Sequence, residues 1–295
     1  MATVITTHRP PKRGRRHSAS MAGKQMHGSK FTYAILAVAA IVSLFPFYWT
    51  IVAASTSNTE INQVPPNWLP GGNLFKNFRA AMDNVDMGKA LLNSLIVSGC
   101  TAAGTVMFAT LAGFAFAKLR FRGRNILLGL TIGTTMVPYQ LGIVPLFLLM
   151  TKLGWGDHLE SVIFPTLVSA FGVFFMRQYL VGALPDELVE AGRVDGASSL
   201  RIFVSIVLPA ARPAMAVLGM LTFMASWNDF FWPIVVLTSH NPTVQVAIDN
   251  LGSGYVPDQS IIMAGTLLGT LPVLAVFIIL GRQIVGGIMQ GAVKG

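Results

Sequence analysis

Asp229 is an acidic residue inside an apolar stretch, residues 213–237, that is long enough to cross a membrane. Its polar and aromatic neighbours are Trp227, Asn228 and Trp232. A carboxylate and an amide can exchange hydrogen bonds with hydroxyl groups, and indole faces can stack on sugar rings. Ionisable groups in membrane spans are costly and are functional candidates by default, so we expect this set to line a solute path. The alternative is a structural or gating role, with Asp229 bonding backbone groups near Pro233 and the tryptophans at the outer membrane interface.

Other reactive side chains form no recognisable catalytic or metal-binding set. The sequence has no GxxxxGK[ST] loop for phosphate, and Gly252-Ser253-Gly254 lacks the lysine that would have to follow. Its five histidines have no ligand spacing, and no Ser/His/Asp or Cys/His arrangement stands out. The single cysteine, Cys100, lies in an apolar stretch and is expected to be a buried packing residue. We therefore expect no enzyme activity, no metal site and no cofactor in this chain.

Residues 183–212 hold a second candidate site, which begins with a short amphipathic helix. Pro185 suits the first turn of a helix, and the carboxylates of Asp186 and Glu187 complement its positive end. One apolar face at helical spacing is formed by Leu188, Ala191 and Val194. An amphipathic element of this kind suits docking into the cleft of a partner, whose motion it would transmit as a lever.

A turn and a second helix follow within the same segment. Gly196 is expected to end the first helix, and Ser198 can cap the second one. The second helix is expected to end near Leu208-Pro209, just before a membrane span. The alternative to a docking element is an ordinary pair of interfacial helices between two spans.

The elements that must position these residues are membrane-spanning helices. Of the 295 residues, 53% are hydrophobic and 11% are charged, whereas a soluble domain carries about 25% charged residues. Six apolar blocks have the length of a span, at about 31–54, 90–117, 126–150, 159–182, 213–237 and 260–285. Prolines inside five of these blocks predict kinks. The sequence thus predicts an all-α membrane protein with six transmembrane helices.

The distribution of basic residues indicates the orientation. Seventeen of the 21 Lys and Arg residues fall on one side of a six-span chain, in residues 1–30, 118–125, 177–212 and the C-terminus. The other four are Lys76, Arg79, Lys89 and Lys152. This bias places both termini in the cytoplasm. We expect the basic tail, residues 1–30, to be disordered and not to bind nucleic acid.

One motif in the second candidate site resembles a known one. Glu190-Ala191-Gly192, three residues, Gly196, nine residues and then Ile206-Val207-Leu208-Pro209 are similar to the EAA motif of the membrane subunits of ABC importers. In that family the motif is the coupling helix that docks into the ATPase subunit. The resemblance implies an ATPase-coupling role for Glu190, Ala191, Gly192, Asp195, Gly196, Leu200, Leu208 and Pro209. Gly192 departs from the alanine that is commoner in the family, which would loosen the helix by about 1 kcal/mol.

The resemblance covers about residues 31–295. The stretch from Trp227 to Pro233 and the tail from Gly287 to Gly295, with its GAVKG ending, are similar to those of carbohydrate-importer permeases of the maltose-transporter type. That family implies the ABC importer type I permease fold in a prokaryotic plasma membrane, with the permease domain at 31–285 and a cytoplasmic tail at 286–295. It also implies four partners: a second permease chain in a heterodimer, two ATPase subunits that hold ATP and magnesium, and an extracytoplasmic sugar-binding protein.

Two further contacts are implied by the resemblance. The outer segment 238–259 resembles the family's scoop loop, whose tip, here Gly252, Ser253 and Gly254, enters the binding protein; the alternative is a flexible surface loop. The tail residues Gln290, Lys294 and Gly295 would contact the ATPase subunits; the alternative is a solvated tail. In the maltose type the sugar is held mostly by the partner permease, so direct sugar contact by this chain stays open.

The transported solute is expected to be a di- or oligosaccharide. The EAA-type motif cannot separate this from an ABC permease for another solute, such as a glycerophosphodiester, a polyamine or sulfate. A channel or secondary carrier that works without ATP is a third class. It would call for inverted repeats or a row of intramembrane charges, which the sequence does not show.

Overall fold

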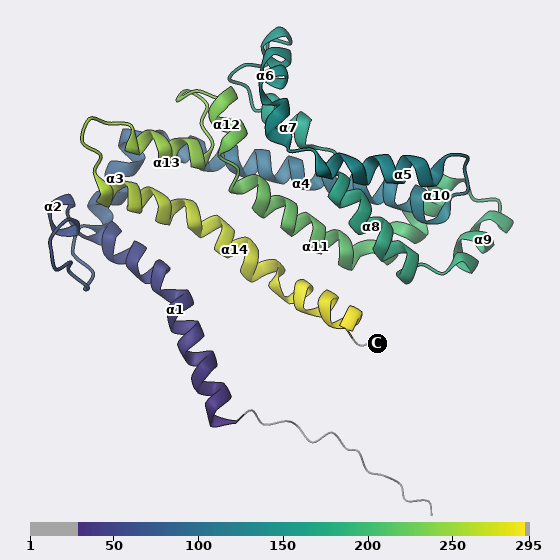
Figure 1. Cartoon of the computed structure of the whole chain (residues 1–295), viewed down its shortest axis with the longest axis horizontal. Coiled ribbons are helices and arrows are strands. Elements are labelled where there is room, and N and C mark those ends of the chain that lie inside the picture. Colours follow the sequence, from purple (N-terminus) through teal and green to yellow (C-terminus); the bar gives the residue numbers. More distant parts are fainter. Residues whose placement is uncertain (1–28, 293–295) are drawn as a thin grey trace, which may run out of the picture. The chain divides into compact units, whose positions relative to one another are not determined.

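The computed structural model describes residues 29–292, and side chains up to residue 279. All the regular structure in this range is helical, as Figure 1 shows. The helices are α1 (Lys30–Ser55), α2 (Asn58–Ile61), α3 (Leu74–Asn84), α4 (Met87–Lys118), α5 (Arg124–Gly133), η1 (Thr134–Met136), η2 (Tyr139–Gly142), α6 (Ile143–Lys152), α7 (Glu160–Thr166), α8 (Ala170–Ala183), α9 (Asp186–Val194), α10 (Ser199–Ile202), η3 (Phe203–Val207), α11 (Leu208–Trp227), α12 (Phe231–Val236), α13 (Val244–Gly252) and α14 (Gln259–Ala292). The basic tail up to residue 28, Lys294, Gly295 and the side chain of Gln290 lie outside the described part, so the expectations for them stay predictions.

The chain divides into two compact units, residues 1–46 and 47–295. In the described part of the first unit, helix α1 exposes large apolar side chains all round, from Phe31 to Phe45. The second unit holds the other helices, and the candidate sites lie in it.

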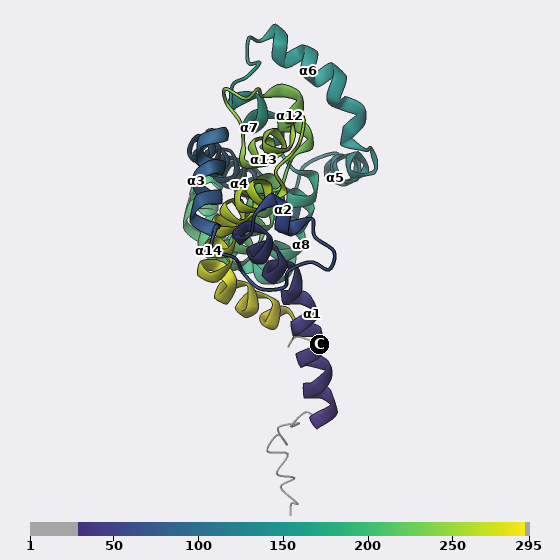
Figure 2. The same cartoon turned by 90° about the vertical axis from the view of Figure 1, so that its left-hand side faces the viewer.

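Four helices are long and apolar enough to cross a membrane: Lys30–Ser55, Met87–Lys118, Ser199–Trp227 and Gln259–Ile279. Two bent pairs pass the same test, Arg124–Met136 with Tyr139–Lys152 at 88° and Glu160–Thr166 with Ala170–Ala183 at 42°. The number becomes the predicted six if each bent pair forms one span. Figure 2 shows the sharp bend between α5 and α6.

The breaks follow from proline chemistry. Proline donates no N–H and disfavours a helical conformation in the residue before it. Val137 accordingly is extended, with φ −88° and ψ 119°, directly before Pro138. Pro165 lies in α7, shortly before that helix ends at Thr166. Helix α1 continues through Pro46, so a proline marks a possible break and does not fix its size.

The fifth span differs from its prediction. It was expected at 213–237, but the helix runs from Ser199 to Trp227, and α12 is a separate short helix. The segment 199–207 therefore belongs to the long helix, through a π-helical turn at Phe203–Val207. Pro209 cannot donate to the carbonyl of Ser205, which favours such an irregular turn.

Helices α4, α8 and α11 pack side by side, and α14 lies along α11 (Figure 1). Their core includes Phe114, Met176, Val207 and Leu218. Helices α4 and α8 approach closely at Gly113, where an added Cβ would lie 2.8 Å from the backbone nitrogen of Arg177 and 2.8 Å from the Cβ of Met176. Small residues of this kind let the backbones of membrane helices come close together.

We expect Gly113→Ala to destabilise the bundle by about 1–3 kcal/mol, because the extra methyl group would force backbone atoms apart. The matched control is Gly99→Ala on the same helix, where an added Cβ would meet nothing within 4 Å. Thermal unfolding of both purified variants in detergent should show a lower midpoint for Gly113→Ala alone. Equal midpoints for the two variants would contradict the close approach of α4 and α8.

Candidate functional site

Helix α9 forms the core of the second candidate site. Val189 and Gly192 are its buried residues. A Cβ on Gly192 would lie 3.1 Å from the Cγ1 of Ile202 in α10, which is tighter than an ordinary contact. Gly192, where the EAA motif more often has alanine, is therefore the point at which α9 and α10 approach each other.

The predicted apolar face of α9 is not the face that packs on the bundle. Its side chains are exposed, with Leu188 at 48% and Val194 at 88% of the full accessible area, and Leu200 beyond the turn is 67% exposed. Ala191 and Glu190 are exposed too. The face of α9 that packs inward is formed by Val189 and Gly192, and Gly192 contacts Ile202. We call the exposed set Leu188, Ala191, Val194 and Leu200 the docking face.

The turn after α9 follows the prediction. Gly196 adopts φ +76°, a left-handed conformation that glycine tolerates best, and its N–H donates to the carbonyl of Arg193. The N–H of Asp195 donates to the carbonyl of Ala191 at 3.0 Å. The hydroxyl of Ser198 accepts from the N–H of Arg201 at 3.2 Å and caps α10.

The prediction that the second helix ends near Leu208-Pro209 is wrong. Both residues lie within the continuous helix from Ser199 to Trp227, in the first turn of α11. Proline is tolerated there because α11 begins with this turn and follows an irregular one. Leu200 of the docking face therefore lies on the helix that crosses the bundle, and the turn at residues 195–198 joins α9 to that helix.

A cavity of about 710 Å³ lies between α4, α7, α8 and α11, and we call it the central cavity. Hydroxyl groups and one carboxylate provide its polar lining: Thr101, Thr105, Tyr139, Thr166, Ser169, Thr222, Ser226 and Asp229. Its apolar lining is Val162, Val168, Phe171, Leu221 and Ala225. No Lys, Arg or His occurs among the described residues around it.

Some of these hydroxyl groups also hold the bend between α7 and α8. The side chain of Thr105 donates to the carbonyl of Thr166 at 3.2 Å, and the hydroxyls of Thr101 and Thr166 are 3.2 Å apart. Helix α7 ends at Thr166, so this carbonyl has no continuing helix to supply a donor. The lining is thus partly fixed by hydrogen bonds between helices.

The structure brings only one member of the predicted solute-path set to the central cavity, namely Asp229. Trp227 and Trp232 are 2% and 4% exposed, and their indole N–H groups donate to the carbonyls of Gly269 and Ser161. Asn228 donates to the carbonyl of Met224 at 2.8 Å. In this structure the tryptophan rings are therefore closed to a ligand and serve packing.

We expected Asp229 to lie within the fifth span, but the structure places it just beyond the end of that helix. It follows the end of α11 at Trp227, and its Oδ1 accepts from the N–H of Phe231 at the start of α12. The hydroxyl lining was missed altogether. Its signal was present as polar residues four apart on one helix face, Thr101 with Thr105 and Thr222 with Ser226.

Two other expectations need correction. The segment 238–259 is not a simple loop but contains α13, whose Val244, Val246 and Ala247 are buried. Gly252 ends that helix, Ser253 and Gly254 are exposed, and the side chains of Tyr255 and Val256 beyond them are almost fully exposed. Cys100 is exposed within the described part of the chain and is not a buried packing residue.

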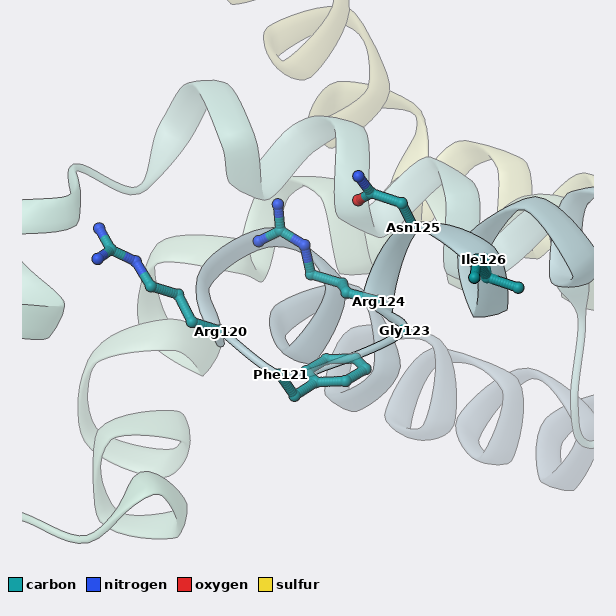
Figure 3. A pocket seen from close by; sticks show the side chains of 6 residues that line it. All are labelled: Arg120, Phe121, Gly123, Arg124, Asn125 and Ile126. Carbon is teal, nitrogen blue, oxygen red and sulfur yellow. The ribbon is translucent and has the colours of Figure 1, made fainter.

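A basic pocket of about 520 Å³ lies at the turn between α4 and α5. Figure 3 shows Arg120 and Arg124 extending to the same side of this turn. Next to it, Lys118 at the end of α4 makes an ion pair of 2.6 Å with Asp186 at the start of α9. Within the described residues no group of three His, Cys, Asp or Glu side chains could hold a metal ion.

The family of binding-protein-dependent transport system inner membrane components matches residues 105–289. The lactose transport system permease protein LacG of Rhizobium radiobacter is 34% identical over 263 residues, which cover 89% of this chain and 95% of LacG. The sn-glycerol-3-phosphate permease protein UgpE of Pectobacterium atrosepticum is 32% identical, over 88% of this chain and 95% of UgpE. The arabinooligosaccharides permease protein AraQ of Halalkalibacterium halodurans is also 32% identical, over 87% and 93%.

The fold is similar to that of a solved structure as well. A crystal structure of a bacterial ABC transporter involved in the import of the acidic polysaccharide alginate matches with a TM-score of 0.75 and 21% identity. The match covers 85% of this chain and 94% of that one.

Proposed function

This chain belongs to the family of binding-protein-dependent transport system inner membrane components, and we propose that it is the permease subunit of an ATP-binding-cassette importer for a neutral di- or oligosaccharide. The sugar arrives from an extracytoplasmic binding protein, and separate subunits bind magnesium and hydrolyse ATP. The chain acts in the plasma membrane of a prokaryote as one half of a permease heterodimer.

The lining of the central cavity carries the choice of solute. Hydroxyl groups dominate its polar part, and they can donate to and accept from the hydroxyls of a sugar. A phosphate group would call for arginine or lysine, which the described lining lacks. The cavity therefore favours a neutral sugar, as in the names of LacG and AraQ, over a phosphorylated solute, as in the name of UgpE.

The docking face supports the proposed coupling to an ATPase. Exposed apolar side chains next to polar ones are typical of a surface that a partner covers. Leu200 at this face and Thr222 at the central cavity belong to one continuous helix and lie roughly 33 Å apart along it. When the ATPase subunits close, they displace α9, and the helix carries this displacement to the cavity wall.

On the side that receives the binding protein, the proposed contact is the turn that follows α13. Ser253 to Val256 form an exposed turn that could enter the sugar site of a docked binding protein. The proposed cycle is one of alternating access. The loaded binding protein docks, and ATP then closes the pair of ATPase subunits. The spans open outward to receive the sugar, and ATP hydrolysis returns them to the starting state. The second permease chain closes the open side of the cavity.

Reconstitution tests this proposal. The chain would be placed in proteoliposomes with the second permease, the ATPase and the binding protein encoded beside it. We expect ATP-dependent uptake of a radiolabelled neutral oligosaccharide, with no uptake of glycerol 3-phosphate. Omitting the ATPase subunit is the control. ATP-dependent uptake of glycerol 3-phosphate without any sugar uptake would refute the sugar assignment.

A further inference from the structure

We propose that the ion pair between Lys118 and Asp186 is a latch through which the docking helix α9 also drives α4, and not α11 alone. The latch rests on the proposed function, because it describes how coupling motion reaches the solute cavity. It assigns a positioning role to two residues outside the stretch that resembles the EAA motif.

The geometry of the pair is asymmetric. The Nζ of Lys118 lies 2.6 Å from the Oδ1 of Asp186. Lys118 is the last residue of α4 and its side chain is only 6% exposed, whereas the side chain of Asp186, the first residue of α9, is 73% exposed. The ammonium group is thus anchored in the bundle, and the carboxylate moves with the docking helix.

The surroundings make the carboxylate necessary. A polar cavity of about 260 Å³ at the pair is lined by the side chains of Lys118, Arg120, Arg124, Asp186, Glu190 and Arg193, together with Ala117 and Val189. Four cations therefore share two carboxylates there. Arg120 and Arg124 extend to the same side of the turn that follows α4 (Figure 3). Without Asp186, the largely buried ammonium of Lys118 would face three guanidinium groups with Glu190 alone to offset them.

The charge state of Asp186 agrees with this arrangement. The hydrogen bond from Lys118 lowers the pKa of Asp186, and the charges of Lys118 and Arg120 lower it further. The carboxylate is therefore ionised at neutral pH. Since the pKa is lowered in the folded chain, the pair is lost only as the pH falls below the ordinary range of a carboxyl group.

The latch joins two walls of one cavity. Helix α9 is linked to α11 through the short segment that follows it in the sequence. Its link to α4, in contrast, is the ion pair between Lys118 and Asp186. Thr105 on α4 lines the central cavity roughly 20 Å along the helix from Lys118. Packed helices resist separation but can slide past each other. An ion pair at the helix end fixes the axial position of α4, so both walls move together when α9 is displaced.

Asp186→Asn and Lys118→Met each remove one charge and keep the size of the side chain. In the reconstituted transporter we expect either variant to raise the ATP hydrolysed per sugar about tenfold, because the motor then moves α11 without α4. The matched control is Asp83→Asn, which breaks the exposed pair of Asp83 with Arg79 at 3.9 Å in α3. It should leave the ratio unchanged.

Rescue separates coupling from folding. Asp186→Glu and the charge-swapped double variant Lys118→Asp/Asp186→Lys should both recover the wild-type ratio of ATP to sugar. Copurification with the ATPase subunit checks that each variant assembles. An unchanged ratio in both single variants, or failure of both rescues in assembled complexes, would overturn the latch. A wild-type complex that imports no sugar would instead refute the proposed function.

Discussion

Replacing Leu188 by glutamate is expected to lower ATP-driven sugar uptake by about thirtyfold, because a central contact of an interface is worth ~2 kcal/mol or more. Leu188 is 48% exposed on the docking face, whereas the buried residues of α9 are Val189 and Gly192. The variant should therefore fold normally. A carboxylate at this position would lose its water on docking without gaining a partner, which weakens binding of the ATPase subunit.

The measurement has two parts. Titration of the solubilised permease with labelled ATPase subunit should give a weaker affinity, and uptake should fall in proportion. Leu188→Met, which keeps the apolar volume, is the control and should behave as wild type. The affinity of the binding protein for its sugar should not change. Binding of the ATPase to Leu188→Glu with wild-type affinity would show that another surface receives the motor.

Local signals explain why the docking element was predictable. A left-handed glycine and a capping serine act on their own neighbours, so Gly196 and Ser198 took the roles that their sequence context indicated. The inward face of α9 could not be read this way. It depends on Ile202, which reaches Gly192 only after the chain has turned back on itself. The six apolar blocks were likewise recognisable, and prolines predicted a kink in the third block but not its size of 88°.

The solute cavity shows the opposite case. Its lining comes from helices far apart in the sequence, so hydroxyl pairs such as Thr101 with Thr105 gain meaning only when α4, α8 and α11 pack together. The same holds for the tryptophans. Trp227 turns inward because Gly269, 42 residues away, offers a carbonyl oxygen to its indole N–H. Sequence neighbours of Asp229 therefore suggested a stacking platform that the tertiary structure uses for packing.

Ala225→Trp is expected to block the central cavity and to reduce sugar uptake by about tenfold or more, because the indole would exclude the sugar from part of the cavity and a tenfold loss corresponds to only ~1.4 kcal/mol of lost solute binding. Ala225 is an exposed residue of α11 that lines this cavity of about 710 Å³, so the indole would occupy solute space without displacing core side chains. The ATPase subunit should still bind, because the docking face lies on α9 and at Leu200, which is at the opposite end of the helix Ser199–Trp227 from Ala225. ATP hydrolysis should therefore persist while uptake falls.

The matched control is Ala225→Ser, which keeps the space of the cavity and adds one more hydroxyl group, and this variant should transport normally. Full uptake in assembled Ala225→Trp complexes would mean that the sugar does not pass this wall, and that the partner permease alone forms the path.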